Sequence, residues 1–237
     1  MLLAIDTATR SMSLALHDGE VLLAEQTCVA GRQQNSQLAP TIDYLVNLCG
    51  ITLADLKAVA VCRGPGSYTG LRVGVALAKG IATTAHLPLI GIDTLDILAA
   101  GVTECNTRAI LIAAVQAGRG RIIAAQFRRK DRQWQARTEP VITTWAEMIA
   151  DLKPGTYFVT GELNEKWDAA CENAPDGVTL KPVAVSDRAR RAGHLAELAW
   201  SVLNAGGYKT GEHTTEALHE AFHPAHVLPI YLKSPDE

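Results

Sequence analysis

Along the first third of the chain, short runs of apolar residues are separated by short polar stretches. Residues 2–6 form an apolar run suited to a buried strand. Two further runs, 12–17 and 21–26, are joined by Asp18-Gly19, a dipeptide typical of two-residue hairpin turns. The pattern therefore predicts three strands, of which the second and third form an antiparallel hairpin.

The period then changes from that of a strand to that of a helix. Ser36 can cap a helix over residues 36–49, and Gly50 is placed to end it. The apolar positions of this segment follow the 3.6-residue period: Leu38, Ile42, Leu45, Val46 and Cys49. A strand over 58–62 and a glycine-rich turn lead into a second predicted helix over 69–85.

A similar order of elements begins again after a strand over 89–92 and a helix near 95–101. The predicted elements are strands over 109–115, 122–127 and 134–142, a helix over 144–152 and a strand over 156–160. Three strands, a helix and a strand thus occur twice. This favours an α/β fold of two ribonuclease-H-like subdomains, the architecture shared by actin, sugar kinases and Hsp70, over a single doubly wound sheet.

The predicted boundary between the subdomains lies at residues 102 and 103. The second subdomain, 103–237, would also hold a helix over 195–203 and a last helix over 215–222, which Pro224 should stop. Its C-terminal segment, with the apolar stretch 227–232, can pack back on the first subdomain.

Composition narrows the class of protein. The 237 residues are 48% hydrophobic and 20% charged, which favours a globular chain with a real core over disorder. The net charge of -3 and the pI of about 6.2 give no overall basic footprint, so any contact with RNA must be local. We find no leader peptide and no apolar run long enough for a bilayer, and the five cysteines show no C-x-x-C pair. We therefore expect a cytoplasmic protein with reduced thiols.

One segment, residues 60–82, combines a tight turn with a helix face of very small residues. Gly64-Pro65-Gly66 permits a sharp reversal after a strand, and Ser67 or Thr69 can cap the helix that follows. Along that helix Gly70, Gly74, Ala78 and Ala82 recur every four residues. Such a face can admit a partner helix or pack against the chain's own sheet. It is no Walker loop, because no G-K-[ST] follows the glycines.

The stretch RGPGSYTGLRVGVALAKGIA closely resembles the signature segment of the TsaB (YeaZ) family. The resemblance extends to AIDTATRSMSLAL, NSQLAPTIDYLVNLCGITLADLKAVAV, PLIGIDTLDILA and the ending PIYLK. The signature residues are Gly64, Pro65, Gly66, Ser67, Tyr68, Thr69, Gly70, Leu71 and Arg72. The chain departs from the family pattern at Asn35, where a histidine is expected, and at residues 116–119, where Gln-Ala-Gly-Arg replaces Asp-Ala-Arg-Arg.

The resemblance implies a non-catalytic scaffold subunit. It would pair with TsaD, which transfers threonylcarbamoyl to the tRNA adenosine next to the anticodon, and with the ATPase TsaE. It would meet tRNA through that complex and form a homodimer when alone. It implies no cofactor of the chain's own, with ATP or ADP at most at the interface of the complex. The expected partner interface lies on the two helices and comprises Leu38, Ile42, Leu45, Val46, Gly70, Leu71, Gly74, Val75, Ala78 and Ala82.

Asp6 is the one candidate for nucleotide binding. Proteins of the actin and sugar-kinase superfamily place an aspartate at the end of the first strand and follow it with a glycine-containing phosphate loop. Here residues 7–11 read Thr-Ala-Thr-Arg-Ser and contain no glycine. A small-molecule kinase is therefore the alternative function, and a strand-end residue that satisfies the neighbouring loop is the simpler interpretation of Asp6.

Two further motifs remain open. His219 to His223 matches H-E-x-x-H, the pattern of zinc proteases, but Pro224 ends the helix at once and only His226 is near as a third ligand. We therefore favour a polar helix end. The first hundred residues hold only His17 and His86, with no histidine pair such as the metal site expected in TsaD.

Two groups of basic residues can contact tRNA phosphates or form an ordinary solvated surface. The first comprises Arg119, Arg121, Arg128, Arg129, Lys130 and Arg132, and the second comprises Arg188, Arg190 and Arg191.

Overall fold

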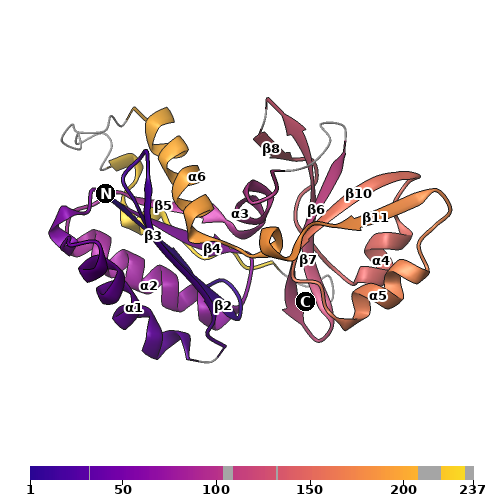
Figure 1. Cartoon of the computed structure of the whole chain (residues 1–237), viewed down its shortest axis with the longest axis horizontal. Coiled ribbons are helices and arrows are strands. Elements are labelled where there is room, and N and C mark those ends of the chain that lie inside the picture. Colours follow the sequence, from indigo (N-terminus) through magenta and orange to yellow (C-terminus); the bar gives the residue numbers. More distant parts are fainter. Residues whose placement is uncertain (32, 104–108, 132, 208–219, 233–237) are drawn as a thin grey trace. The chain divides into compact units, whose positions relative to one another are not determined.

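The computed structural model describes residues 1–31, 33–103, 109–131, 133–207 and 220–232. Contacts within the chain divide it into two compact units. The first unit contains Met1–Ile97 and Arg190–Ile230, and the second contains Leu98–Ala189 with the end of the chain from Tyr231. Figure 1 shows the elements of each unit with their labels.

The first unit is built on a five-stranded sheet with the order β3-β2-β1-β4-β5. Its strands are β1 (Leu2–Asp6), β2 (Ser11–His17), β3 (Leu22–Val29), β4 (Ala58–Gly64) and β5 (Leu89–Asp93). The first three strands are antiparallel neighbours, whereas β4 is parallel to both β1 and β5. The predicted hairpin is confirmed, because β2 and β3 flank the turn at Asp18 and Gly19.

Both faces of this sheet are covered by helices. Leu3 and Ile5 of β1 face one way, toward α1 (Gln34–Leu48) and α2 (Tyr68–Thr84). Leu2 and Ala4 face the other way, toward α6 (Ala192–Ala205). Figure 1 shows α1 and α2 together on one face and α6 on the other. Since successive side chains of a strand point to opposite faces, a fully apolar strand is what a sheet covered on both sides requires.

The second unit repeats the same strand order, β8-β7-β6-β10-β11. Its strands are β6 (Ile110–Gly118), β7 (Arg121–Lys130), β8 (Gln133–Ala136), β10 (Gly155–Gly161) and β11 (Val178–Pro182), while β9 (Val141–Thr143) also pairs with β7. The helices α4 (Trp145–Ala150) and α5 (Glu165–Glu172) cover one face, where the rings of Trp145 and Trp167 meet edge to face at 4.7 Å. The duplicated ribonuclease-H-like architecture of the actin and sugar-kinase superfamily is confirmed.

Three elements of the second unit differ from the prediction. The strand predicted over 134–142 is two strands, β8 and β9, which pair with different parts of β7. The helix α5 and the strand β11 were not predicted. Both are short and mostly exposed to solvent, and α5 begins because the Asn164 side chain accepts a hydrogen bond of 3.0 Å from the Lys166 amide.

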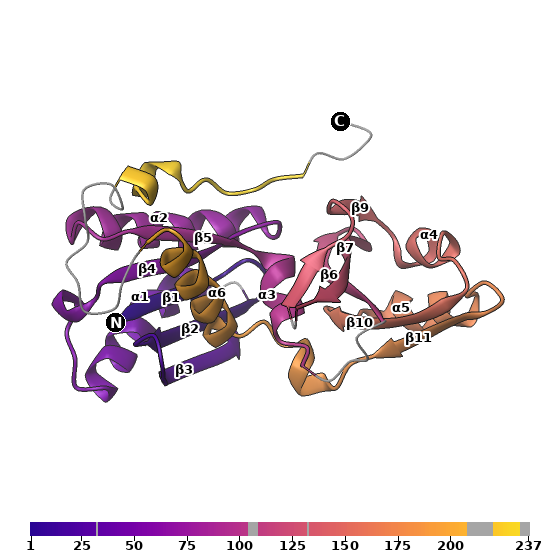
Figure 2. The same ribbon diagram turned by 90° about the horizontal axis from the view of Figure 1, so that it is seen from above.

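The predicted boundary at 102 and 103 is wrong for the end of the chain. Helix α6 packs on the first sheet, where Leu195, Ala199 and Leu203 are fully buried. The segment 220–230 also packs on the first unit, as the sequence allowed. The Leu89 amide donates to the Phe222 carbonyl at 2.9 Å, and the Ile230 amide donates to the Arg63 carbonyl at 2.7 Å. Figure 2 shows this segment beside α2.

The remaining elements are short. Helix α3 (Thr94–Ala100) follows β5, and three single turns of 3-10 helix are η1 (Leu53–Asp55), η2 (Val185–Arg188) and η3 (Pro224–His226). Of the helix predicted over 215–222, residues 215–219 lie outside the described residues.

Candidate functional site

The signature segment forms the turn between β4 and the start of α2. The Gly64-Pro65 peptide bond is cis, and Gly64 has a φ of 114°, a conformation that favours glycine. Ser67 is the N-cap of α2, and its side chain accepts a hydrogen bond of 3.3 Å from the Gly70 amide. Capping by Ser67 was one of the two predicted possibilities, and it fixes where the helix starts.

The glycines of the signature allow this turn to lie directly against the loop that follows β1. A Cβ atom at Gly66 would lie 2.2 Å from the Ala8 carbonyl oxygen, and one at Gly70 would lie 2.2 Å from that of Thr7. Hydrogen bonds join the same segments. The Ser67 amide donates to the Ala8 carbonyl at 2.6 Å, and the Thr7 hydroxyl donates to the Gly70 carbonyl at 2.7 Å. The signature segment therefore packs against the loop that follows β1, within the first unit.

The small-residue face of α2 packs in the chain's own core, which was one of its two predicted roles, and its role in a partner interface stays a prediction. All six predicted residues of α2 are buried: Gly70, Leu71, Gly74, Val75, Ala78 and Ala82. A Cβ atom at Gly74 would lie 2.2 Å from the Thr7 hydroxyl oxygen, within the same unit. The predicted residues of α1 are also buried: Leu38, Ile42, Leu45 and Val46. Leu71, Ala78 and Ala82 are 0% exposed and add no contact area of their own, whereas Ile42 and Val46 keep 5% and 6% exposure.

An apolar groove nevertheless opens between the same two helices. Its volume is about 170 Å³, and its lining residues are Ala39, Ile42, Asp43, Val46, Leu53, Leu77 and Ile81. Ile42 and Val46, which were predicted, form part of this lining, whereas Leu53, Leu77 and Ile81 were missed. The sequence does carry a signal for the α2 side, because Val73, Leu77 and Ile81 repeat every four residues beside the small-residue stripe. We call this feature the α1–α2 groove.

Asp6 lies at the end of β1, fully buried, and is neutralised by an arginine of the same unit. One carboxylate oxygen accepts from the Ala8 amide at 2.9 Å, and the other accepts from Arg190 Nε at 2.8 Å. Arg190 also donates to the Thr9 hydroxyl at 2.9 Å. The simpler interpretation of Asp6, a strand-end residue that satisfies the neighbouring loop, matches this geometry.

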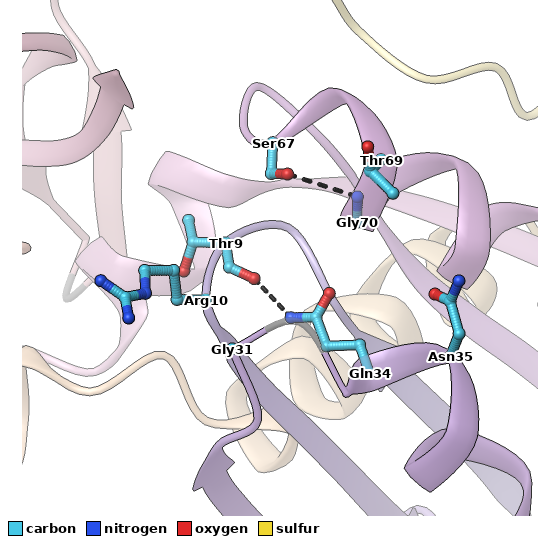
Figure 3. A pocket seen from close by; sticks show the side chains of 8 residues that line it. All are labelled: Thr9, Arg10, Gly31, Gln34, Asn35, Ser67, Thr69 and Gly70. Atoms are coloured by element: carbon cyan, nitrogen blue, oxygen red, sulfur yellow. Dashed lines mark hydrogen bonds between the residues drawn. The ribbon is translucent and has the colours of Figure 1, made fainter. Parts of the chain in front are cut away.

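A polar pocket of about 630 Å³ lies next to this loop, at the starts of α1 and α2. Its lining residues are Thr9, Arg10, Gly31, Gln34, Asn35, Ser67, Thr69 and Gly70. Figure 3 shows that Gln34 bonds to the Thr9 carbonyl across the pocket, while the guanidinium of Arg10 extends away from Gln34 and Asn35. Among the described residues, this lining contains hydroxyls, amides and the Arg10 guanidinium but no carboxylate and no imidazole, so it suits hydrogen bonding. Asn35, the departure from the family pattern, lies here.

The two basic groups differ in how far the fold uses them. In the second group, Arg190 is buried against Asp6, and Arg191 pairs with Glu25 at 2.7 Å. Arg190 therefore cannot contact tRNA phosphates, and the prediction that allowed it to do so is wrong. In the first group, Arg129 donates to the Thr103 carbonyl at 2.9 Å, Arg119 lies in the turn between β6 and β7, and Arg132 is outside the described residues.

The H-E-x-x-H match does not have the geometry of a zinc site at its second histidine. The helical residues end at 221, and His223 is instead the N-cap of η3, where its Nδ1 accepts from the Ala225 amide at 3.2 Å. His219 lies outside the described residues. Within the part of the chain that the structure describes, no three His, Cys, Asp or Glu side chains are grouped as metal ligands.

The described cysteines Cys28, Cys49, Cys62 and Cys171 are free thiols, and Cys105 lies outside the described residues. Cys62 is fully buried beside the Thr94 hydroxyl, 3.1 Å away, and burial raises the pKa of its thiol. No helix among the described residues is both long enough and apolar enough to cross a membrane.

The two duplicated units place the chain in the actin and sugar-kinase class of folds. Residues 27–227 match the sequence model of the family described as TsaD: tRNA N6-adenosine threonylcarbamoyltransferase. The chain is 35% identical over 242 residues to the tRNA threonylcarbamoyladenosine biosynthesis protein TsaB of Haemophilus influenzae, an alignment that covers 98% of this chain and 93% of that protein. The chain therefore belongs to the TsaB (YeaZ) branch of this family.

Two further comparisons agree with that membership. The TsaB protein of Escherichia coli is 37% identical over 131 residues, which is 55% of this chain and 56% of that protein. The solved structure of YeaZ from Pseudomonas aeruginosa superimposes with a TM-score of 0.74 at 22% identity and covers 98% of this chain and 99% of that chain. At this identity the superposition shows the fold alone.

Proposed function

We propose that the chain is a non-catalytic subunit in the biosynthesis of threonylcarbamoyladenosine in tRNA. It pairs with a TsaD-type transferase, which carries out the chemistry, and TsaE joins the assembled complex. In this proposal the chain contacts tRNA, and ATP or ADP, only within that complex. The names of its relatives support the pathway, and the α1–α2 groove supports the pairing.

The α1–α2 groove is the observation that carries the proposal. Exposed apolar area at a groove between two helices is typical of a surface that another protein covers. Leu53 is 46% exposed at its rim, although it is a large aliphatic side chain. On α1 outside the groove lining, Tyr44 is 57% exposed and Leu48 is 63% exposed. The same surface serves a second copy of the chain when no transferase is present, which gives the homodimer.

The absence of catalysis in this proposal rests on Asp6. A carboxylate that is fully buried and paired with Arg190 can neither bind a cation nor accept a proton from a substrate without breaking that pair. The described residues that line the polar pocket beside it include no carboxylate and no imidazole. The chain therefore contributes binding surface to the complex and leaves the transfer step to its partner.

The test is pairing with the TsaD-type transferase of the same organism, measured by calorimetry, followed by a transfer assay with and without this chain. Leu53→Glu places a charge at the rim of the groove and should weaken pairing at least tenfold, as expected for an interface hot spot. Val202→Glu is the matched control, because Val202 is 40% exposed on α6, across the sheet from the groove. Equal pairing by both variants would exclude the groove as the interface.

Wild-type chain that neither pairs with the transferase nor raises its activity would overturn the whole proposal. Sedimentation of the chain alone then shows whether the homodimer exists and whether Leu53→Glu separates it. ATP turnover by the isolated chain would contradict the non-catalytic assignment.

A further inference from the structure

One face of the hairpin formed by β7 and β8 carries positive charge without any carboxylate. In β7 the side chains alternate between a buried and an exposed face, so that Phe127 is buried while Arg128 and Lys130 are exposed. The register places Arg128 opposite Gln135 and Lys130 opposite Gln133. The exposed face therefore contains Gln126, Arg128, Lys130, Gln133, Gln135 and Arg137. We call it the β7–β8 cationic face.

Among the described residues, no carboxylate forms an ion pair with a cation of this face. Between residues 121 and 138 the sequence holds six basic residues and only one acidic residue, Asp131, which lies in the turn. Within the described part of the chain, neither Arg128 nor Lys130 has an ion-pair partner. Arg137 has only the neutral Gln126 side chain, 3.2 Å away. An ordinary solvated surface in a chain of net charge -3 would more often intersperse the two signs.

Other basic residues of the chain have structural roles, which Arg128 and Lys130 lack. Arg129 points to the opposite face, donates to the Thr103 carbonyl at 2.9 Å and lies 5.9 Å from the centre of the Trp134 ring. Arg190 and Arg191 of the other basic group form ion pairs with Asp6 and Glu25. Arg128 and Lys130 have no such role, so the fold gives no reason of its own for their charge.

We propose that the β7–β8 cationic face binds the phosphate backbone of the tRNA in the assembled complex. Arginine, lysine and glutamine side chains are common donors to phosphate oxygens, and such contacts position the nucleic acid without reading its sequence. This inference rests on the proposed function, since the near-neutral chain has too few cations here to hold RNA alone. It assigns the RNA contact to the first basic group and excludes Arg190 from it.

The experiment measures binding of an unmodified tRNA transcript to the complex of this chain with its transferase, at salt concentrations from 50 to 200 mM. Arg128→Gln with Lys130→Gln removes two cations and keeps both positions polar. Each phosphate contact contributes about 0.9 to the slope of log affinity against log salt, so the slope should fall by about 2. The affinity gained between 200 and 50 mM salt should therefore shrink about tenfold.

The matched control is Lys153→Gln with Lys181→Gln, which removes two exposed lysines from the same unit. It should leave the slope unchanged, and a thermal melt checks that both double variants fold. Equal slopes in the two variants, with pairing to the transferase intact, would overturn the assignment. Loss of pairing in the first variant alone would also overturn it, because the face would then contact protein. Pairing of the wild-type chain with the transferase is measured separately. If it fails, both the proposed function and this inference are contradicted.

Discussion

The buried pair of Asp6 and Arg190 links two parts of the chain that are 184 residues apart. Each side chain is almost completely removed from solvent, with exposures of 0% and 3%. Removing one partner of such a pair leaves a buried charge without compensation, which costs much more than removing both. The sequence shows Asp6 at a strand end, but no local pattern indicates which distant arginine neutralises it.

Arg190→Met should therefore lower the free energy of unfolding by about 3 to 5 kcal/mol. Methionine keeps much of the length of the side chain but leaves Asp6 unpaired. The double variant with Asp6→Asn should be more stable than Arg190→Met alone, because the buried charge is gone. Urea unfolding of the four proteins gives the comparison. A loss below about 1 kcal/mol in the single variant would mean that water reaches Asp6.

A second carboxylate gives the stability a pH dependence. Burial, with repulsion from Asp93, raises the pKa of Asp96 to about 6, while Arg63 opposes the shift. The folded state therefore binds this proton more tightly than the unfolded state does, whose pKa is about 3.9. The contribution of Asp96 to the free energy of unfolding should fall as the pH rises from about 4 to about 6, and stay constant above that range.

Asp96→Asn removes this contribution, so the wild type can be compared with the variant at each pH. The difference in unfolding free energy between the variant and the wild type should change in favour of the variant as the pH rises through this window. Chemical denaturation at several pH values between 4 and 7 measures it. A difference that does not vary with pH would show that Asp96 titrates normally.

At the scale of elements, periodicity predicted which segments form helices but not what each helix face contacts. The stripe of Gly70, Gly74, Ala78 and Ala82 suits any close neighbour, and the Thr7 and Ala8 loop proves to be that neighbour. The elements with strong apolar patterns were predicted, from β1 to α3 in the first unit. Those held by short polar caps or by distant pairing, such as α5 and β11, were not, because their stability comes from tertiary contacts.

Two glycines of α2 should respond in opposite ways to the same change. At Gly70 a methyl group would meet the Thr7 backbone oxygen at 2.2 Å, so Gly70→Ala should destabilise the fold by about 1 to 3 kcal/mol. At Gly80 nothing lies within 4 Å, so Gly80→Ala should stabilise it by about 0.5 to 1 kcal/mol through helix propensity. Thermal melts of both variants provide the test. Similar effects at the two positions would contradict the internal packing of the signature.

At the scale of the whole molecule, the first unit is discontinuous and the second is nearly continuous. The chain leaves the first unit after Ile97 and returns to it at Arg190 with α6 and the segment that follows. The sequence allowed the return of the last segment but did not predict that of α6, because the apolar face of α6 would suit either sheet. The first unit depends on it, since Leu2, Ala4 and Ala60 share their core with α6.

A fragment of residues 98–189 should therefore fold by itself, whereas a fragment of residues 1–97 should not. The fragment 98–189 contains the sheet β8-β7-β6-β10-β11 with its core around Trp145, Trp167 and Val159. The fragment 1–97 lacks α6, the helix that covers one face of its sheet, and its exposed apolar strands favour aggregation. Joining residues 1–97 to 190–230 through a flexible linker should restore a cooperative unit. It returns α6, the Phe222 carbonyl that accepts from the Leu89 amide, and the Ile230 amide that donates to the Arg63 carbonyl. Circular dichroism melts of the three polypeptides measure this. A cooperative melt of residues 1–97 alone, at the temperature of the joined fragment, would show that α6 is dispensable for the first unit.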